Sequence, residues 1–167
     1  MSLISFIKEA GEKLFSHGPA KEAQATAQAA PSPENVAKLS DAAGSAIADY
    51  VRSQGLKVDD LKVAFDSSNG TVTVSGVAPD QATKEKVVLC CGNVANVTSV
   101  NDMLTVDSPA AESQWYTVAG GDTLSKISKQ FYGDANQYNK IFEANRPMLS
   151  DPNKIYPGQV LRIPPAA

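Results

Sequence analysis

The sequence predicts an α+β chain made of two small domains. Over residues 38–107, two helical patterns and three strand patterns follow one another in the order helix, strand, strand, helix, strand. Residues 114–167 carry a second pattern, in the order strand, helix, helix, strand. Helices and short strands that share one core define the α+β class, and 167 residues, 43% of them hydrophobic, are enough for two small cores.

The first predicted element is an amphipathic helix over residues 2–15. Gly11 interrupts it and lowers the helix propensity there. In one interpretation the helix simply docks on the core, and in the other Gly11 loosens the backbone and turns nearby carbonyls toward a ligand. In either case we expect residues 1–16 to pack on the first domain. Apolar residues recur at helical spacing: Leu3, Phe6, Ile7, Ala10 and Leu14.

A linker is predicted next, over residues 17–37. Alanine, glutamine and proline dominate its first part, and residues 17–35 contain no large apolar side chain. Such a segment buries too little surface to offset the entropy lost on ordering. We therefore predict a flexible linker with at most a transient helix.

The first domain begins with a helix that Ser40 caps and Gly55 closes. Residues 61–65 and 71–76 alternate as strands do, and Asn69-Gly70 between them supplies the backbone that a hairpin turn needs. The first helix turns one apolar face inward, with Ala43, Ile47, Tyr50 and Val51.

Its second half is a helix followed by a strand. Pro79 suits the first turn of a helix, and Gly92-Asn93 is a typical end. Val97 to Val106 form the third strand, which completes an αββαβ order.

Residues 108–113 form a short predicted linker, after which the second domain begins with a strand at Trp115–Val118. Asp122 is a good N-cap for a helix over 123–132, and Gly133 is a good C-cap. A second helix over 135–145 and a strand at Val160–Ile163 complete the βααβ order.

Charge and hydropathy narrow the classes of partner. The net charge is −3, so the chain has no basic surface to neutralise nucleic acid phosphates. The N-terminal apolar positions are interrupted by Lys8 and Glu9, unlike a signal peptide, and no run approaches the roughly 20 apolar residues of a membrane span. We predict a cytoplasmic monomer without a membrane span or nucleic acid partner.

The sequence contains no pattern typical of an enzyme. The single histidine, His17, lies in the predicted linker, where nothing positions it as a base. Cys90 and Cys91 lack the spacing of a redox motif, and their apolar neighbours predict buried core residues. We therefore predict a binding protein, with no catalytic residues and no organic cofactor.

The second domain resembles a LysM module. The residues that carry the resemblance are Gly121-Asp122-Thr123-Leu124, Phe131-Tyr132-Gly133 and Ile155-Tyr156-Pro157-Gly158-Gln159. The resemblance implies binding of N-acetylglucosamine-containing glycans by two loops. These loops would contain Gly121, Asp122, Thr123, Leu124, Asn145, Ile155, Tyr156 and Pro157.

The first domain resembles a BON domain, through the strand Thr71–Gly76 and the strand that starts Val97-Thr98-Ser99-Val100. Over nearly its whole length the chain resembles the bacterial cytoplasmic potassium-binding proteins, most specifically at Phe6–Leu14, Lys84–Asn93 and Gln114–Ile163. That resemblance implies a K⁺ ligand and a BON domain with an extra N-terminal helix before the LysM domain. Rb⁺ and Cs⁺ also lose their water easily, so we expect them to substitute for K⁺ in part.

The chemistry of potassium suits such a chain. Selective sites replace the water of K⁺ with backbone carbonyls, which need no acidic residues, and helix C-termini leave carbonyls unpaired. Two segments offer such carbonyls, Ile7–Glu12 and Gly92–Val97, and a desolvated cage could form if they converge. The resemblance implies main-chain ligands at Ile7, Ala10, Glu12, Gly92, Val94 and Val97.

From these patterns we expect an ion sensor or buffer that becomes ordered and compact when it binds K⁺, with an unknown protein partner possible. The alternative is an adaptor of the cell envelope that binds glycan or peptidoglycan through the second domain. A scaffold without any small ligand is a third interpretation.

Overall fold

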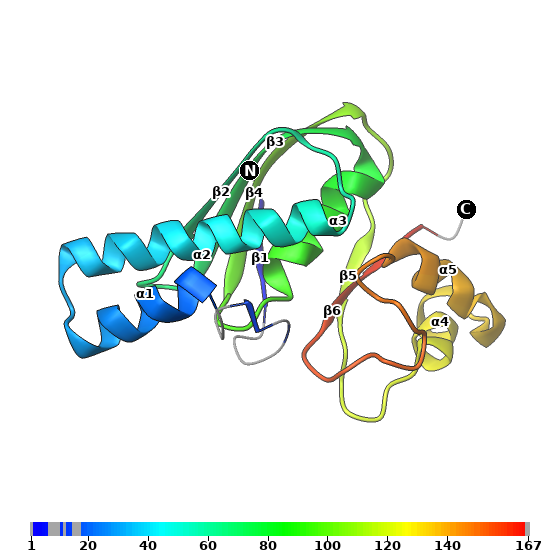
Figure 1. The fold of residues 1–167 in the computed structure, drawn as a ribbon. Helices are drawn as coiled ribbons and strands as arrows, with labels where there is room; N and C mark the ends of the chain where they lie inside the picture. Colours follow the sequence, from blue (N-terminus) through cyan, green and yellow to red (C-terminus); the bar gives the residue numbers. More distant parts are fainter. Residues whose placement is uncertain (1, 7–10, 12, 15–17, 166–167) are drawn as a thin grey trace.

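The computed structural model describes residues 2–6, 11, 13–14 and 18–165. The first domain is a four-stranded sheet in the order β1-β4-β3-β2, in which β3 and β4 are parallel and the outer pairs are antiparallel. Helices α2 and α3 pack on one side of this sheet, and α1 lies along α2 (Figure 1). The bounds of these elements are β1 Ser2–Ser5, α1 Gly18–Ala29, α2 Pro33–Ser53, β2 Asp59–Asp66, β3 Thr71–Asp80, α3 Gln81–Gly92 and β4 Ser99–Ser108.

The second domain is a two-stranded antiparallel sheet with short helices beside it (Figure 1). Its strands are at opposite ends of the domain sequence, so their pairing closes the domain into one unit. The bounds are β5 Gln114–Thr117, α4 Leu124–Tyr132, η2 Ala135–Gln137, α5 Tyr138–Ala144 and β6 Val160–Ile163.

Each domain has its own apolar core, and the two domains also share apolar surface. The first core lies between the sheet and its helices, where Val72, Val74 and Val100 are fully buried. Val160 of the second domain belongs to that same core, and Trp115 packs against it. The domains are therefore docked on each other rather than merely connected.

The N-terminal prediction was wrong for its first residues. We expected a helix from residue 2, but residues 2–5 form β1, which pairs antiparallel with Ser99–Asp102 of β4. The sheet edge decides this, because β4 presents an unpaired row of backbone groups that a strand can satisfy and a helix cannot. Residues 7–10 and 12 of the predicted helix lie outside the described residues.

The predicted linker also differs from the structure, because α1 occupies residues 18–29 and α2 already starts at Pro33. The alanines have high helix propensity, and α1 gains its stability by packing along α2, where Ala20 is buried. Ser32 caps α2 by accepting a hydrogen bond of 3.1 Å from the N–H of Asn35.

Local capping rules succeeded for some helix ends and failed for others. Gly133 ends α4 in the left-handed conformation, as predicted, but the N-cap of α4 is Thr123 rather than Asp122. Pro79 does not open a helix, because β3 continues to Asp80, whose side chain then caps α3. Cys90 and Cys91 are buried in the first core, as expected.

Candidate ion-binding loop and domain interface

The loop after α3 is the part of the structure in which the predicted ion ligands can be located. The helix ends at Gly92, and Asn93 follows as C-cap with its N–H donating to the carbonyl of Leu89 at 2.9 Å. A tight turn follows, in which the N–H of Val97 donates to the carbonyl of Val94 at 3.1 Å. Val94 and Val97 are fully buried, whereas Asn93, Ala95 and Asn96 are half-buried.

The N-terminal segment contacts this loop at two glycines. A Cβ atom at Gly92 would lie 2.0 Å from the ring of Phe6, so only glycine lets this ring reach the end of α3. A Cβ atom at Gly11 would lie 2.4 Å from the carbonyl carbon and oxygen of Asn93. Gly11 also has φ +104°, a backbone conformation that residues with a side chain rarely adopt. The structure thus places Gly11 against the loop after α3.

The six predicted ion ligands divide into two groups. Gly92 is the last residue of α3, and Val94 and Val97 are buried in the loop that follows it, whereas Ile7, Ala10 and Glu12 lie outside the described residues. Gly11, between them in sequence, contacts the peptide of Asn93 and Val94. Gly11, the described residue of the segment Ile7–Glu12, therefore meets the segment Gly92–Val97 at this point.

The chemistry around the loop favours neutral oxygen donors over a transition metal or calcium site. Among the residues that the structure describes, no group of three or more His, Cys, Asp or Glu side chains could hold a metal ion. Cys90 lies just before the loop, and burial raises the pKa of its thiol to about 12, which keeps the thiol protonated. The loop of residues 93–98 has no charged side chain, and its peptide carbonyls are neutral donors that suit a large monovalent cation.

Asn93 also connects this loop to the second domain, a role that its sequence position did not indicate. Its side-chain Nδ2 donates to the carbonyl of Val160 at 2.8 Å, and its Oδ1 accepts from the N–H of Val160 at 2.9 Å. A carboxamide has the donor and acceptor of a peptide group, so it pairs with Val160 much as a neighbouring strand would.

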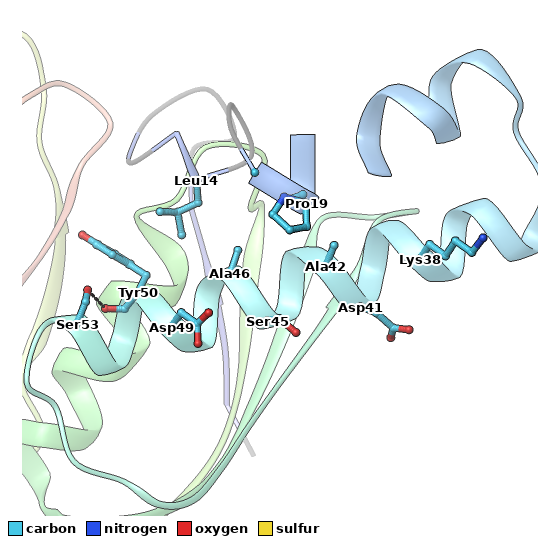
Figure 2. A pocket seen from close by; sticks show the side chains of 12 residues that line it. Leu14, Pro19, Lys38, Asp41, Ala42, Ser45, Ala46, Asp49, Tyr50 and Ser53 are labelled. Atoms are coloured by element: carbon cyan, nitrogen blue, oxygen red, sulfur yellow. Dashed lines mark hydrogen bonds between the residues drawn. The ribbon is translucent and has the colours of Figure 1, made fainter. Parts of the chain in front are cut away.

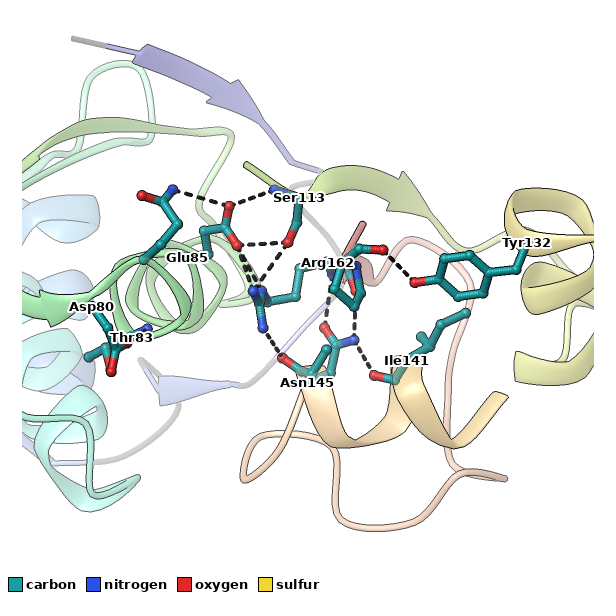
Figure 3. Close-up of polar contacts among 11 residues, drawn as sticks. Asp80, Thr83, Glu85, Ser113, Tyr132, Ile141, Asn145 and Arg162 are labelled. Atoms are coloured by element: carbon teal, nitrogen blue, oxygen red, sulfur yellow. Dashed lines mark hydrogen bonds and ion pairs between the residues drawn. The ribbon is translucent and has the colours of Figure 1, made fainter. Parts of the chain in front are cut away.

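A buried ion pair forms the second polar contact between the domains (Figure 3). Arg162 of β6 donates to Glu85 of α3 through Nη2 at 2.7 Å and Nε at 3.0 Å. The N–H and hydroxyl of Ser113, in the interdomain linker, each donate to this carboxylate at 2.8 Å. Since Glu85 is only 3% exposed and Arg162 7%, the network is desolvated and joins both domains and their linker.

We expect domain docking to weaken in acid because of Glu85. Burial alone would raise the pKa of this carboxyl, but hydrogen bonds from Ser113 and Arg162 outweigh burial and lower the pKa below its usual value. A carboxyl whose pKa is lower in the docked state stabilises docking fully at pH values above its ordinary pKa. This stabilisation is lost as the pH falls through the lowered pKa of the docked state. Fluorescence of Trp115, the only tryptophan, measures docking during an acid titration. We expect the pH midpoint of undocking to shift in Glu85→Gln, because this variant lacks the carboxyl that titrates.

The predicted glycan loops are adjacent in the structure, since Val118 exchanges hydrogen bonds of 2.8 Å with Gly158 and Gln159. Several of their residues have structural roles. Asp122 accepts from Ala119 N–H at 2.8 Å and from the Tyr116 hydroxyl, and Thr123 caps α4.

The other predicted loop residues divide between core and surface. Asn145 is buried, and its side chain bonds to the N–H and carbonyl of Arg162 at 2.9 and 3.0 Å. Leu124 is buried and Ile155 packs against the same core, whereas Gly121 and Pro157 are exposed and Tyr156 is half-buried.

A separate hollow lies along α2 where α1 begins (Figure 2). Its floor is apolar, formed by side chains such as Leu14, Ala42 and Ala46, and Lys38 and Asp41 lie at its margin. These charged groups do not converge on one point, so we assign no ligand to it. Within the described part of the chain, no helix is long and apolar enough to cross a membrane.

Fold and family models together define a two-domain protein with a BON domain followed by a LysM domain. The BON domain model matches residues 35–108, and the LysM domain model matches residues 116–164. The chain belongs to the family of the "Potassium binding protein Kbp" of Escherichia coli O6:H1 (strain CFT073), to which it is 43% identical over 164 residues. That alignment covers 98% of this chain and 99% of the relative, which confirms the predicted resemblance and the α+β class.

Shorter matches exist to larger proteins. An uncharacterized protein of Deinococcus radiodurans is 53% identical over 49 residues, which are 29% of this chain and 19% of that protein. An esterase of Mycobacterium tuberculosis is 50% identical over 48 residues, or 29% of this chain and 10% of the esterase. So small a share of the esterase carries no argument for esterase activity here.

Proposed function

We propose that the protein binds a potassium ion through main-chain carbonyls at the junction of its N-terminal segment and the loop after α3. The ligands would be the carbonyls of Ile7, Ala10 and Glu12 together with those of Gly92, Val94 and Val97. The observation that carries this proposal is the contact of Gly11, which lies between Ala10 and Glu12 in the sequence, with the Asn93 peptide, which lies between Gly92 and Val94. The printed name of the relative that matches the whole chain supports the same ligand.

The type of donor supports K⁺ over other common cations. Peptide carbonyls are neutral, so they compensate little for the dehydration of Ca²⁺ or Mg²⁺, which are usually held by carboxylates. K⁺ gives up its water more easily than Na⁺, and a ring of carbonyls can replace that water. Rb⁺ and Cs⁺ share this property, so we expect them to substitute in part.

The proposed role is that of a cytoplasmic sensor or buffer of potassium rather than an enzyme. The ion would connect the N-terminal segment to the BON domain, and the ordered domain would then hold the LysM domain more firmly. A ligand that binds only the folded state stabilises that state by mass action. Binding should therefore make the protein both more compact and more stable.

The expected result is a higher melting temperature in potassium chloride than in sodium chloride of equal ionic strength. At one hundred times the dissociation constant, the ion contributes about 2.7 kcal/mol, which raises the midpoint of a chain of this size by about 5–10 °C. Differential scanning calorimetry measures the shift, and titration calorimetry of ion-depleted protein gives the affinity.

Equal melting temperatures in the two salts, without heat of binding, would overturn the proposal. The LysM loops would then become the candidate site, because Val118 holds the loop before α4 beside residues 158–159. N-acetylglucosamine oligomers would be the ligand to titrate, as expected for a glycan-binding adaptor of the envelope.

A further inference from the structure

Asn93 contacts three parts of the protein at once. Its main chain lies between Gly92 and Val94, two of the proposed ion ligands. Its carbonyl is so close to Gly11 that a Cβ atom there would lie 2.4 Å away. Its side chain bonds to both peptide groups of Val160 in the other domain. A movement of the loop therefore moves a contact between the domains.

The contact of Asn93 with Val160 satisfies backbone groups on the edge of β6 that faces away from β5. Successive residues of a strand direct their N–H and C=O to opposite sides, so residues two apart direct theirs to the same side. Val160 and Arg162 both direct these groups away from β5, and each bonds to the carboxamide of an asparagine. Asn145 of the same domain covers Arg162, with distances of 2.9 and 3.0 Å. Asn93 of the BON domain covers Val160, so this edge of β6 is satisfied only partly from within its own domain.

The two hydrogen bonds between Asn93 and Val160 require one relative position of the two residues. The nitrogen and the oxygen of the carboxamide each form a hydrogen bond to Val160, at 2.8 and 2.9 Å, and Val160 is buried in the core of the first domain. If the loop shifted, the N–H and C=O of Val160 would lose both partners while its side chain remained packed. Buried peptide groups without partners are unfavourable, so the loop conformation and the docked position of β6 stabilise each other.

We propose that Asn93 is a positioning residue that couples potassium binding to docking of the LysM domain. This inference rests on the proposed function. An ion held by the carbonyls of Gly92 and Val94 fixes the peptide group before Asn93 and the peptide group after Val94. The backbone of Asn93 lies between these two fixed groups, so the direction of its side chain toward Val160 is fixed as well. Coupling between two sites is reciprocal, so docking also strengthens ion binding by the same factor.

The test uses full-length protein and two substitutions at this position. Asn93→Ala removes both hydrogen bonds, and Asn93→Asp keeps the acceptor for the Val160 N–H but removes the donor to its carbonyl. Asn139→Ala, on the exposed surface of α5, is the matched control. Small-angle scattering measures the potassium-dependent decrease in radius of gyration, and titration calorimetry measures the K⁺ affinity.

We expect Asn93→Ala to lose this compaction and to bind K⁺ about tenfold more weakly, within the usual range of coupling. Asn93→Asp should be impaired as well, whereas the control should match the unmodified protein. A variant that keeps its compaction, or one that undocks while its affinity stays within twofold, would overturn the inference. Failure of the unmodified protein to respond to K⁺ would instead overturn the proposed function.

A double-mutant cycle separates coupling from a merely structural role. Glu85→Gln weakens docking at a contact away from the ion loop, so it should lower K⁺ affinity when Asn93 is present. In the Asn93→Ala background Glu85→Gln should leave K⁺ affinity unchanged, because the coupling between the ion loop and docking is already lost. An equal decrease in both backgrounds would contradict the role assigned to Asn93.

Discussion

Gly11→Ala is expected to abolish the potassium-dependent rise in melting temperature. An alanine Cβ would overlap the carbonyl of Asn93 at 2.4 Å, and this neighbour is backbone that cannot rotate away. The φ of +104° adds strain of about 1–3 kcal/mol for a residue with a side chain. Either Gly11 or the loop must move, so the carbonyls that we propose as ligands would no longer converge. The melting temperature in potassium chloride should fall to the value in sodium chloride.

Gly18→Ala is the matched control for this experiment. Gly18 also has a positive φ, +68°, but no neighbour lies within 4 Å of the Cβ position. This variant carries the conformational cost of alanine without the overlap, so it should melt somewhat lower in both salts and keep the difference between them. If Gly11→Ala behaved like Gly18→Ala, the segment around Gly11 would have no part in ion binding.

The elements that could be predicted from sequence are those specified by local residues. The turn between β2 and β3 ends in Asn69-Gly70, where Gly70 has φ +72°, and α4 ends at Gly133 in the left-handed conformation. Both patterns act within a few residues, so they give the same structure in most surroundings. The order of the two domains followed from such signals together with the resemblance to known families.

The N-terminal strand could not be predicted in this way. The apolar spacing of Leu3 and Phe6 fits a helix, but Ile4 and Phe6 also alternate as in a strand. The choice depends on the open edge of β4, which is about 95 residues away in sequence and offers Ser99–Asp102 as partners. The helix α1 was missed for a related reason, because its stability comes from α2 and not from large apolar side chains.

The interface residues were missed because their roles depend on the docking of the two domains. Asn93 looks like an ordinary helix cap in the sequence, and Glu85 like an ordinary exposed helix residue. Only the docked structure shows that they meet Val160 and Arg162, 67 and 77 positions further along. A polar side chain that is buried by a partner domain leaves no periodic signal, so one sequence alone cannot identify it.

Glu85→Ala is expected to separate the domains. It leaves the guanidinium of Arg162, which is 7% exposed, without the carboxylate that accepts from it at 2.7 and 3.0 Å. Removal of one partner of a buried ion pair costs about 3–5 kcal/mol, because the remaining charge stays desolvated. Here the charge of Arg162 can be hydrated again if the LysM domain moves away. The destabilisation therefore affects docking of the domains. Scattering should show a larger radius of gyration, and Trp115 fluorescence should change.

Glu143→Ala provides the control, because Glu143 also pairs with an arginine, Arg146, at 3.4 Å, but both side chains are more than half exposed. An exposed pair of this kind contributes about 0–1 kcal/mol, so the domains should stay docked. If Glu85→Ala were as mild as this control, the apolar contacts of Val160 and Trp115 would hold the domains together on their own. The requirement for the buried pair can then be tested directly, since Glu85→Gln retains the shape of the side chain and removes only its charge.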